Sequence, residues 1–138
     1  MTENNATPPR SLPKPYSNRD YDFFYAGLAR RELLVQRCTG CGQLRNPPGP
    51  MCPHCQSLEW EALRLGGRGT VYSYTIHHHP PLPGFPTPHV IALVGFPEGT
   101  RLLGGLRGVA ADRVAIGMPV AVEFETVGET PTYYYRPV

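Results

Sequence analysis

The residues best suited to chemistry in this 138-residue chain are its four cysteines. They form two Cys-x-x-Cys pairs that are separated by ten residues: Cys38, Cys41, Cys52 and Cys55. Cysteines at this spacing are typical of paired zinc knuckles, in which two tight turns direct four thiolates at one metal ion. Gly40 and Gly42 supply turns that larger residues would resist. The spacing therefore predicts one tetrahedral site with four sulfur ligands.

Other uses of these cysteines compete with structural zinc. Disulfides are disfavoured if the protein is cytoplasmic, where thiols stay reduced, and a thioredoxin-like redox centre needs a βαβ unit that this sequence lacks. Iron is the chief rival metal, because an S4 tetrahedron accepts either ion. Four cysteine ligands leave no open coordination position, so we expect a structural and not a catalytic metal. Its removal is expected to disorder residues 35–60.

Histidines are the next candidates. His77 and His79 should share one face of a strand, since neighbouring residues of a strand point to opposite sides, and His89, across a proline-rich loop, could lie near them. They could bind a second metal or act as acid and base, but no cluster of Asp or Glu accompanies them. Strand-end histidines that hydrogen-bond a loop are the favoured interpretation. His54, inside the second cysteine pair, is expected to be a solvated turn residue.

No further catalytic motif is present in the sequence. It contains no G-x-S-x-G, no fifth cysteine and no phosphate-binding loop. Glu123 and Glu125 alternate on what should be the outer face of a strand. An independent enzyme that uses the histidines on a thioester would need a catalytic partner residue that the sequence does not supply.

Composition favours short strands and turns over long helices, since the chain has 15 Gly and 17 Pro. Its formal net charge of +2 comes from scattered residues and implies neither a nucleic-acid nor a membrane partner. No apolar segment approaches the roughly 18 residues that a membrane span needs, and the N-terminal segment lacks the apolar core of a secretory signal. We therefore expect a cytoplasmic protein.

Residues 1–16 contain four prolines among polar residues and are predicted to form a flexible arm. Residues 17–34 predict an N-terminal helix of about four turns, with its N-cap at Ser17 or Asn18. Its apolar residues follow the i, i+3, i+4, i+7 pattern: Tyr21, Phe24, Tyr25 and Leu28. Packing on the chain's own core and docking on another protein both remain open for this stripe.

The remaining sequence divides into a metal ribbon over residues 35–62 and a β-domain over residues 63–138. Five strands are predicted in the latter: 66–79, 89–96, 101–108, 119–127 and 132–138. Val120, Val122 and Phe124 should share the inner face, and the paired glycines of the third strand suggest a bulge or bend. Five short strands with a glycine-led, bent first strand fit a small closed barrel, most simply an OB-fold.

The order of these features is informative. The segments GLARRELLVQRC, GRGTVYSYT, VIALVGFPEGTRLLGGLRG and IGMPVAVEF, together with the cysteine pairs, resemble the zinc-ribbon/OB-fold acyl-CoA-associated proteins, a family labelled as a domain of unknown function. The resemblance covers about residues 20–127. It implies an N-terminal helical segment, a rubredoxin-like zinc ribbon with the four cysteines as ligands, and an OB barrel. It also implies partners that are thiolase-like or hydratase enzymes acting on coenzyme A thioesters, some in steroid side-chain breakdown.

The leading hypothesis is therefore a non-catalytic subunit of a thiolase-like acyl-CoA enzyme, most plausibly an aldolase of steroid side-chain degradation. The aromatic helix would dock on the partner, and the barrel would help to form the acyl-CoA channel near His77, His79 and His89. The alternative is a single-stranded nucleic-acid-binding protein, since zinc ribbons and OB-folds both occur in that role. Its positive charge is limited to Lys14 and twelve dispersed arginines, which disfavours it.

Overall fold

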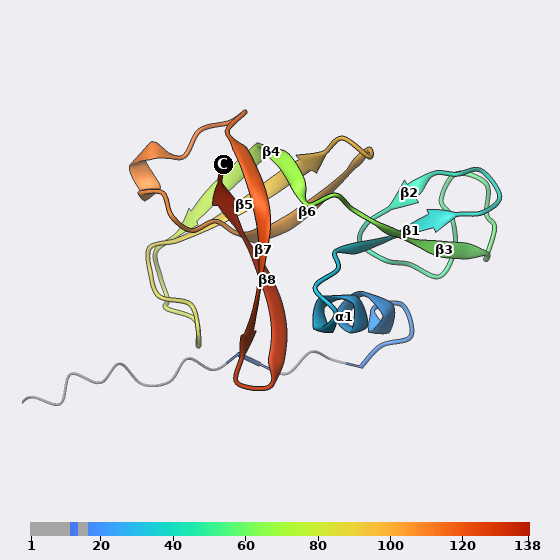
Figure 1. The fold of residues 1–138 in the computed structure, drawn as a ribbon, viewed down its shortest axis with the longest axis horizontal. Helices are drawn as coiled ribbons and strands as arrows, with labels where there is room; N and C mark the ends of the chain where they lie inside the picture. The colour runs from blue at the N-terminus through green and yellow to red at the C-terminus, as the bar shows by residue number, and fades with distance from the viewer. Residues whose placement is uncertain (1–11, 14–16) are drawn as a thin grey trace, which may run out of the picture.

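The computed structural model describes residues 12–13 and 17–138, so the predicted arm over residues 1–16 lies almost wholly outside the described residues. The elements are α1 (Asp22–Ala29), β1 (Leu34–Cys38), β2 (Leu44–Arg45), β3 (Trp60–Arg64), β4 (Arg68–His77), β5 (His89–Phe96), β6 (Thr100–Gly105), the 3-10 helix η1 (Ala111–Arg113), β7 (Pro119–Val127) and β8 (Thr130–Pro137). A three-stranded sheet lies at one end of the molecule and a five-stranded sheet at the other (Figure 1). Helix α1 contacts both β1 and β8.

The smaller sheet has the order β2-β1-β3 and is antiparallel throughout. Its central strand β1 pairs along its whole length with β3, from Leu34 opposite Arg64 to Cys38 opposite Trp60. The base of this sheet joins the core of the larger one, because Leu33, Val35 and Leu65 belong to the same cluster of buried side chains. The ribbon is therefore anchored at one end and projects from the barrel at the other.

The larger sheet has the order β6-β5-β4-β7-β8, and a parallel bridge between Leu106 and Tyr135 nearly closes it into a barrel. This is the five-stranded arrangement that the sequence predicts for residues 63–138. The bounds of β5 and β7 agree with the predicted strands, and β4 and β6 are shorter than predicted. Alternate residues of β5 are buried, beginning with Val90, as expected for a strand with one face on the core.

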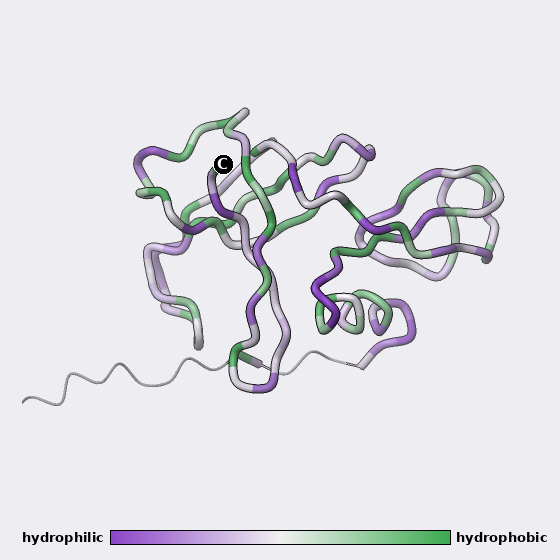
Figure 2. The backbone as a smooth tube through the Cα atoms, in the orientation of Figure 1, coloured by the Kyte–Doolittle hydropathy of each residue, from purple (hydrophilic) through white to green (hydrophobic). Residues whose placement is uncertain are grey.

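Strand β7 also follows the predicted alternation. Val120 is buried and Val122 and Phe124 pack against the core, whereas Glu123 and Glu125 form ion pairs on the outside. Figure 2 shows this alternation as hydrophobic and hydrophilic stretches along the tube of β7. The predicted inner and outer faces of this strand are confirmed.

The paired glycines of β6 do not form the predicted bulge, because the register between β5 and β6 is continuous. A Cβ atom on Gly104 would lie 2.6 Å from Cε2 of Tyr135, and one on Gly105 would lie 3.0 Å from Cε1 of His89. The absence of side chains at Gly104 and Gly105 therefore leaves space for the rings of Tyr135 and His89. The irregularity occurs instead in β4, between Val71 and Ser73.

The N-terminal helix is shorter than the predicted four turns, since α1 has only eight residues. The Asn18 side chain accepts a hydrogen bond from the Asp20 N–H (2.8 Å), and the Asn18 backbone N–H donates to Asp22 Oδ1 (3.0 Å), so this segment is a turn. The helix ends where Arg31 adopts a φ of +60°. In the described part of the chain, no helix is long and apolar enough to cross a membrane.

Candidate metal centre and binding surfaces

The two Cys-x-x-Cys segments form matching tight turns at the free end of the ribbon. In the first turn the Gly42 N–H donates to the Cys38 carbonyl oxygen (2.8 Å), and in the second the Gln56 N–H donates to the Cys52 carbonyl oxygen (2.9 Å). Gly42 and Gln56 each follow the second cysteine of their pair, and both have a left-handed φ, +78° and +62°. Gly40 has no left-handed φ, and a Cβ on it would lie 3.4 Å from Cys55 Sγ, which is an ordinary contact, so of the two glycines only Gly42 is required by its turn.

The four sulfur atoms lie within 4.8 Å of one another. Cys38 Sγ is 3.5 Å from Cys55 Sγ, and Cys41 Sγ is 3.7 Å from Cys52 Sγ. A tetrahedral zinc ion with Zn–S bonds of about 2.3 Å requires sulfur–sulfur distances of about 3.8 Å. All four cysteines are free thiols and not disulfides. The residues present therefore fit one zinc ion with four thiolate ligands.

Backbone groups of each turn favour the thiolate form that a metal needs. The Cys41 N–H donates toward the Cys38 sulfur and lowers the pKa of that thiol to about 6. In the second turn the Cys55 N–H acts in the same way and lowers the pKa of Cys52. Hydrogen bonds to the charged form are a general cause of such shifts. Backbone hydrogen bonds at Gln43 and Ser57 act in the same sense on Cys41 and Cys55, but burial and the neighbouring sulfurs outweigh them and raise the pKa of both thiols. The backbone of each turn thus favours one thiolate, and a bound metal ion would supply the charge that stabilises the other.

A closed set of four sulfur ligands determines what this centre can do. When bound, zinc would cross-link the two turns and hold β1 against the loop of the second pair. No ligand position is left for water or substrate. The centre is structural.

A cleft of about 1210 Å³ separates the ribbon from the barrel. Three segments line it: residues 43–53 of the ribbon and residues 68–72 and 95–101 of the barrel. Its lining includes Arg45, Arg68 and Arg101 and contains no Asp or Glu. The cleft is therefore an electropositive site that joins the two parts of the chain.

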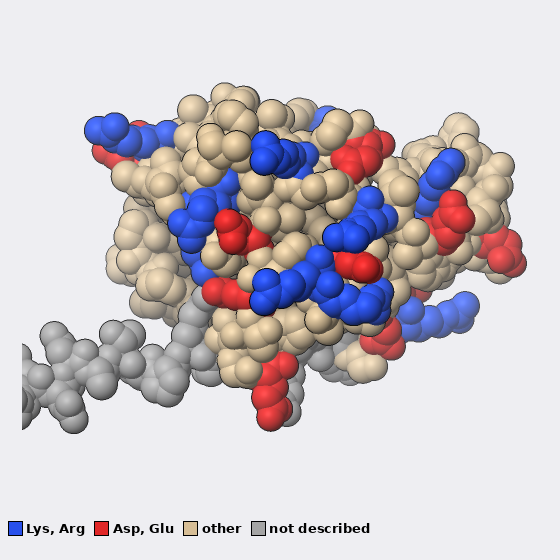
Figure 3. Space-filling view, in the orientation of Figure 1, with Lys and Arg blue, Asp and Glu red and all other residues tan. Residues whose placement is uncertain are grey.

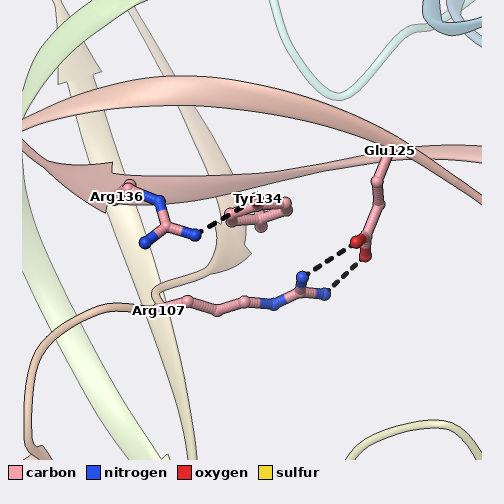
Figure 4. Close-up of polar contacts among 4 residues, drawn as sticks. All are labelled: Arg107, Glu125, Tyr134 and Arg136. Atoms are coloured by element: carbon pink, nitrogen blue, oxygen red, sulfur yellow. Dashed lines mark hydrogen bonds and ion pairs between the residues drawn. The ribbon is translucent and has the colours of Figure 1, made fainter.

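A different polar cluster lies over β7 and β8 (Figure 4). Both terminal nitrogens of Arg107 donate to the Glu125 carboxylate, at 2.6 and 3.0 Å, and the Arg107 guanidinium lies 3.9 Å from the centre of the Tyr134 ring. Arg136 donates to the Tyr134 hydroxyl (3.3 Å) and lies 3.9 Å from Glu123. Figure 3 shows that basic and acidic side chains mix on the face of the molecule that it presents. Because both arginines are paired with side chains of β7 or β8, we interpret the cluster as a structural contact that links these strands.

Comparison with known proteins follows the same two-part division. Residues 26–61 match the family model described as the ChsH2 rubredoxin-like zinc ribbon domain, and residues 63–125 match the ChsH2 C-terminal OB-fold domain. The solved structure described as "Ltp2-ChsH2(DUF35) aldolase" is similar with a TM-score of 0.85 and 46% identity, over 90% of this chain and 98% of that one. This chain belongs to the DUF35 family.

Curated relatives of this DUF35 chain are described as parts of acyl-CoA enzymes. The probable enoyl-CoA hydratase alpha subunit of Thermomonospora curvata is 46% identical over 99% of this chain and 43% of its own length. The 3-oxo-4,17-pregnadiene-20-carboxyl-CoA hydratase alpha subunit of Mycobacterium tuberculosis is 42% identical over 94% of this chain and 41% of its own length. Benzoylsuccinyl-CoA thiolase subunit BbsA of Thauera aromatica is 31% identical, over 69% of this chain and 70% of its own. The chain thus spans less than half the length of the two hydratase subunits.

The helix stripe of this DUF35 chain packs largely on its own barrel. Leu28 is buried in the core, Phe24 and Tyr25 are half-buried against it, and the Phe24 ring meets the Tyr133 ring edge-on at 5.9 Å. Tyr21 stacks on Tyr25 at 6.3 Å. Packing on the chain's own core, the alternative left open by the sequence, describes most of the stripe. Each of the four residues is at least half-buried, and docking of the stripe on another protein stays a prediction.

The candidate histidines are divided by the structure. His77 and His89 are directly opposite each other on β4 and β5, whereas His79 is exposed beyond the end of β4. His77 Nε2 lies 2.6 Å from the Pro80 carbonyl oxygen, which is the loop hydrogen bond favoured from the sequence. His89 lies 5.0 Å from the Phe85 ring and lines a cavity of about 440 Å³. His54 is exposed, as predicted.

Sequence reasoning missed the arginine cleft. Its basic residues are far apart in the sequence, between Arg45 and Arg101, and each stands alone among neutral neighbours. Only the placement of the ribbon beside the barrel brings them together. The exposed Tyr72, at the irregular position of β4, gave no signal either, because it continues the alternating strand pattern.

Proposed function

We propose that this chain is a non-catalytic accessory subunit of a thiolase-like acyl-CoA enzyme, an aldolase of steroid side-chain degradation. The observation that carries the proposal is its likeness to nearly the whole of a chain in the Ltp2-ChsH2(DUF35) aldolase structure. Its relatives named as a steroid-CoA hydratase subunit and a thiolase subunit support the same class. In this role the chain works in the cytoplasm, where its thiolates stay reduced for zinc.

The described side chains support an accessory role. The one cysteine cluster that they form is a closed metal site. The Glu125 carboxylate already accepts hydrogen bonds from Arg107 and is therefore engaged in an ion pair. His77 is engaged with a loop carbonyl and has no carboxylate to orient it as a base. The partner therefore supplies the nucleophile or base, and this chain supplies walls that exclude water and orient the substrate.

We propose that the acyl-CoA channel lies near His77, His79 and His89. Support comes from the cavity beside His89, whose walls are mostly apolar and include Val90 and Leu106. A cavity of this size suits part of an acyl group. Docking is assigned to the aromatic stripe through its half-buried rings, beginning with Tyr21.

The alternative of single-stranded nucleic-acid binding is not favoured by the comparisons. The relatives and the solved structure reported above are described as hydratase, thiolase and aldolase components. Of the C-terminal tyrosines that could have stacked bases, Tyr135 is fully buried and Tyr133 packs against the core, whereas Tyr72 on β4 is exposed.

The test is reconstitution with a thiolase-like partner. We expect co-expression to yield a stable complex by light scattering, and cleavage of a steroid side-chain CoA thioester only when both proteins are present. Tyr21→Ser should weaken the complex, and Tyr74→Ser, a change at an exposed barrel tyrosine, should not. Full activity of the partner alone, or turnover by this chain alone, would contradict the proposal.

A further inference from the structure

The cleft between the ribbon and the barrel holds three arginines without a carboxylate partner. The ion pairs among the described residues involve other arginines, and none of them includes Arg45, Arg68 or Arg101. Glu98, which adjoins the cleft, turns one carboxylate oxygen to the Gly66 N–H instead (2.7 Å). Because no acidic side chain lines the cleft, the positive charge of its walls is not neutralised there.

Arg45 is the most unusual of the three, since it is only 7% exposed. Its Nε donates to Gln36 Oε1 (2.8 Å), which also accepts from the Gly49 N–H (2.8 Å). Its two terminal nitrogens are covered and have no hydrogen-bond partner among the described residues. A buried cation with unpaired donors is costly. An anion in the cleft would compensate this charge.

The barrel wall adds two exposed arginines and a ring. Arg68 and Arg101 are both exposed, and the Arg101 guanidinium lies 3.7 Å from the centre of the Tyr72 ring. Tyr72 is 52% exposed. Asn46 Nδ2 donates to the Arg101 carbonyl oxygen (2.9 Å), which ties the ribbon to this wall. A stacked pair of guanidinium and ring offers flat surface to a nucleobase, and the exposed guanidinium groups suit phosphate oxygens.

We infer that this cleft binds the nucleotide half of a coenzyme A thioester, with the phosphates at Arg68 and Arg101 in the field of Arg45 and the adenine beside Tyr72. The name of the ligand rests on the proposed function. The chemistry of the cleft by itself selects a ligand with phosphate groups and a flat base. The cleft is also large enough, because ligand sites are commonly about 300–1,000 Å³.

The outer face of β5 connects this cleft with the channel assigned above. Gly95 lines the cleft and His89 lines the smaller cavity, and the two residues face the same side because six positions separate them. At about 3.4 Å per residue they are roughly 20 Å apart. Leu103, opposite Leu93 on this face, is 60% exposed. A ligand bound at both ends needs a long flexible linker, and the pantetheine arm of coenzyme A is one.

Calorimetry on the zinc-loaded chain without a partner tests the inference directly. The probes are coenzyme A, adenosine 3′,5′-bisphosphate, pyrophosphate and pantetheine. We expect the first two to bind and pantetheine to bind at least tenfold more weakly. Arg101→Gln and Arg68→Gln should each weaken coenzyme A binding about tenfold, the usual effect of losing a charged hydrogen bond. Arg37→Gln, a change at an exposed ribbon arginine outside the cleft, should have no effect.

The variant Tyr72→Ala tests stacking of the base separately from binding of the phosphates. It should weaken coenzyme A about tenfold by loss of stacking and leave pyrophosphate binding unchanged. Equal binding of pantetheine and coenzyme A, or unchanged affinity in both arginine variants, would overturn the inference. Tighter binding of a single-stranded oligonucleotide than of coenzyme A would overturn it in favour of a nucleic-acid site. Loss of partner binding in Arg101→Gln with coenzyme A affinity intact would assign the cleft to an acidic partner surface instead.

The two proposals fail in different ways. If the chain binds coenzyme A through these arginines but forms no complex with a thiolase-like protein, the proposed function fails and the cleft inference stands. If the complex forms and is active, while Arg68→Gln and Arg101→Gln change neither the affinity of the chain nor the KM of the complex, the cleft inference fails alone.

Discussion

The ribbon and the barrel of this chain are held together by different means. Apart from Val35, which belongs to the core shared with the barrel, the buried side chains of the ribbon are Gln36, Cys38, Arg45 and Cys52, so its free end has no aliphatic core. The barrel buries a contiguous apolar cluster that includes Val71, Val94, Leu102, Val120 and Tyr135. Metal coordination therefore stabilises the ribbon, whereas burial of apolar side chains stabilises the barrel. The two halves should respond oppositely to chelation and to core mutation.

The largest expected effect is loss of the metal. Cys52→Ser removes one of four thiolates, and zinc binding in small modules is worth on the order of 10 kcal/mol. We expect the ribbon to unfold while the barrel strands remain, because the barrel keeps its own core. Metal analysis and circular dichroism measure both consequences, and should also find zinc and not iron in the unmodified chain.

His54→Ala is the matched control for this change, since His54 lies in the same turn but is exposed. It should leave zinc content and spectrum unchanged. An intact ribbon in the metal-free Cys52→Ser variant would contradict the contrast between the two regions.

Truncation in the barrel core comes second. Tyr135 is fully buried and its hydroxyl donates to the Leu102 carbonyl oxygen (3.1 Å). Tyr135→Ala should lower the free energy of unfolding of the barrel by about 3–5 kcal/mol, as for other large-to-small core changes. Tyr135→Phe should cost about 1 kcal/mol, because it loses only the hydrogen bond. Zinc binding should persist in any Tyr135→Ala protein that still folds, and a variant as stable as the parent would show that the ring is not part of the core.

Adding one methyl group beside this ring has the next largest effect. Gly104→Ala would place a Cβ 2.6 Å from the Tyr135 ring. We expect a loss of about 1–3 kcal/mol in thermal unfolding, the usual cost of overpacking. Gly49→Ala is the control in the ribbon, where a Cβ meets nothing within 4 Å. Equal stability of the two variants would mean that room for the ring is not the reason for glycine at this position.

The smallest expected effect concerns the Arg107–Glu125 pair over β7 and β8. Its side chains are 34% and 27% exposed, so solvent screens the attraction. A double-mutant cycle of Arg107→Gln and Glu125→Gln should give a coupling energy of about 1 kcal/mol or less that declines in salt. A coupling of several kcal/mol that is insensitive to salt would indicate that the pair is more central to the barrel than its exposure suggests.

The predictable parts of the fold were those with a local signal. Cysteine spacing was sufficient for the metal site, since each turn is made by adjacent residues. Alternation was sufficient for β5 and β7, because one face of each lies on the core. The length of the N-terminal helix was overestimated, because the turn at Asn18 depends on a side-chain hydrogen bond that hydrophobic periodicity does not report.

The remainder depended on contacts between distant segments. The role of Gly104 follows from Tyr135, which is 31 positions later and one strand away in the closed barrel. The arginine cleft depends on how the ribbon lies against the barrel, and no short motif encodes that. The direct pairing of His77 with His89 depends on the register of β4 and β5, whereas the sequence predicts only that His77 and His79 share a face and that His89 could lie near them.

Hydrogen exchange on the zinc-loaded and chelator-treated chain tests the central contrast most directly. The account predicts that removing zinc abolishes protection of amides in β1, β2 and β3 toward the cysteine end, while β5 and β7 keep theirs. Retained protection of the ribbon without metal, or simultaneous loss in ribbon and barrel, would contradict it.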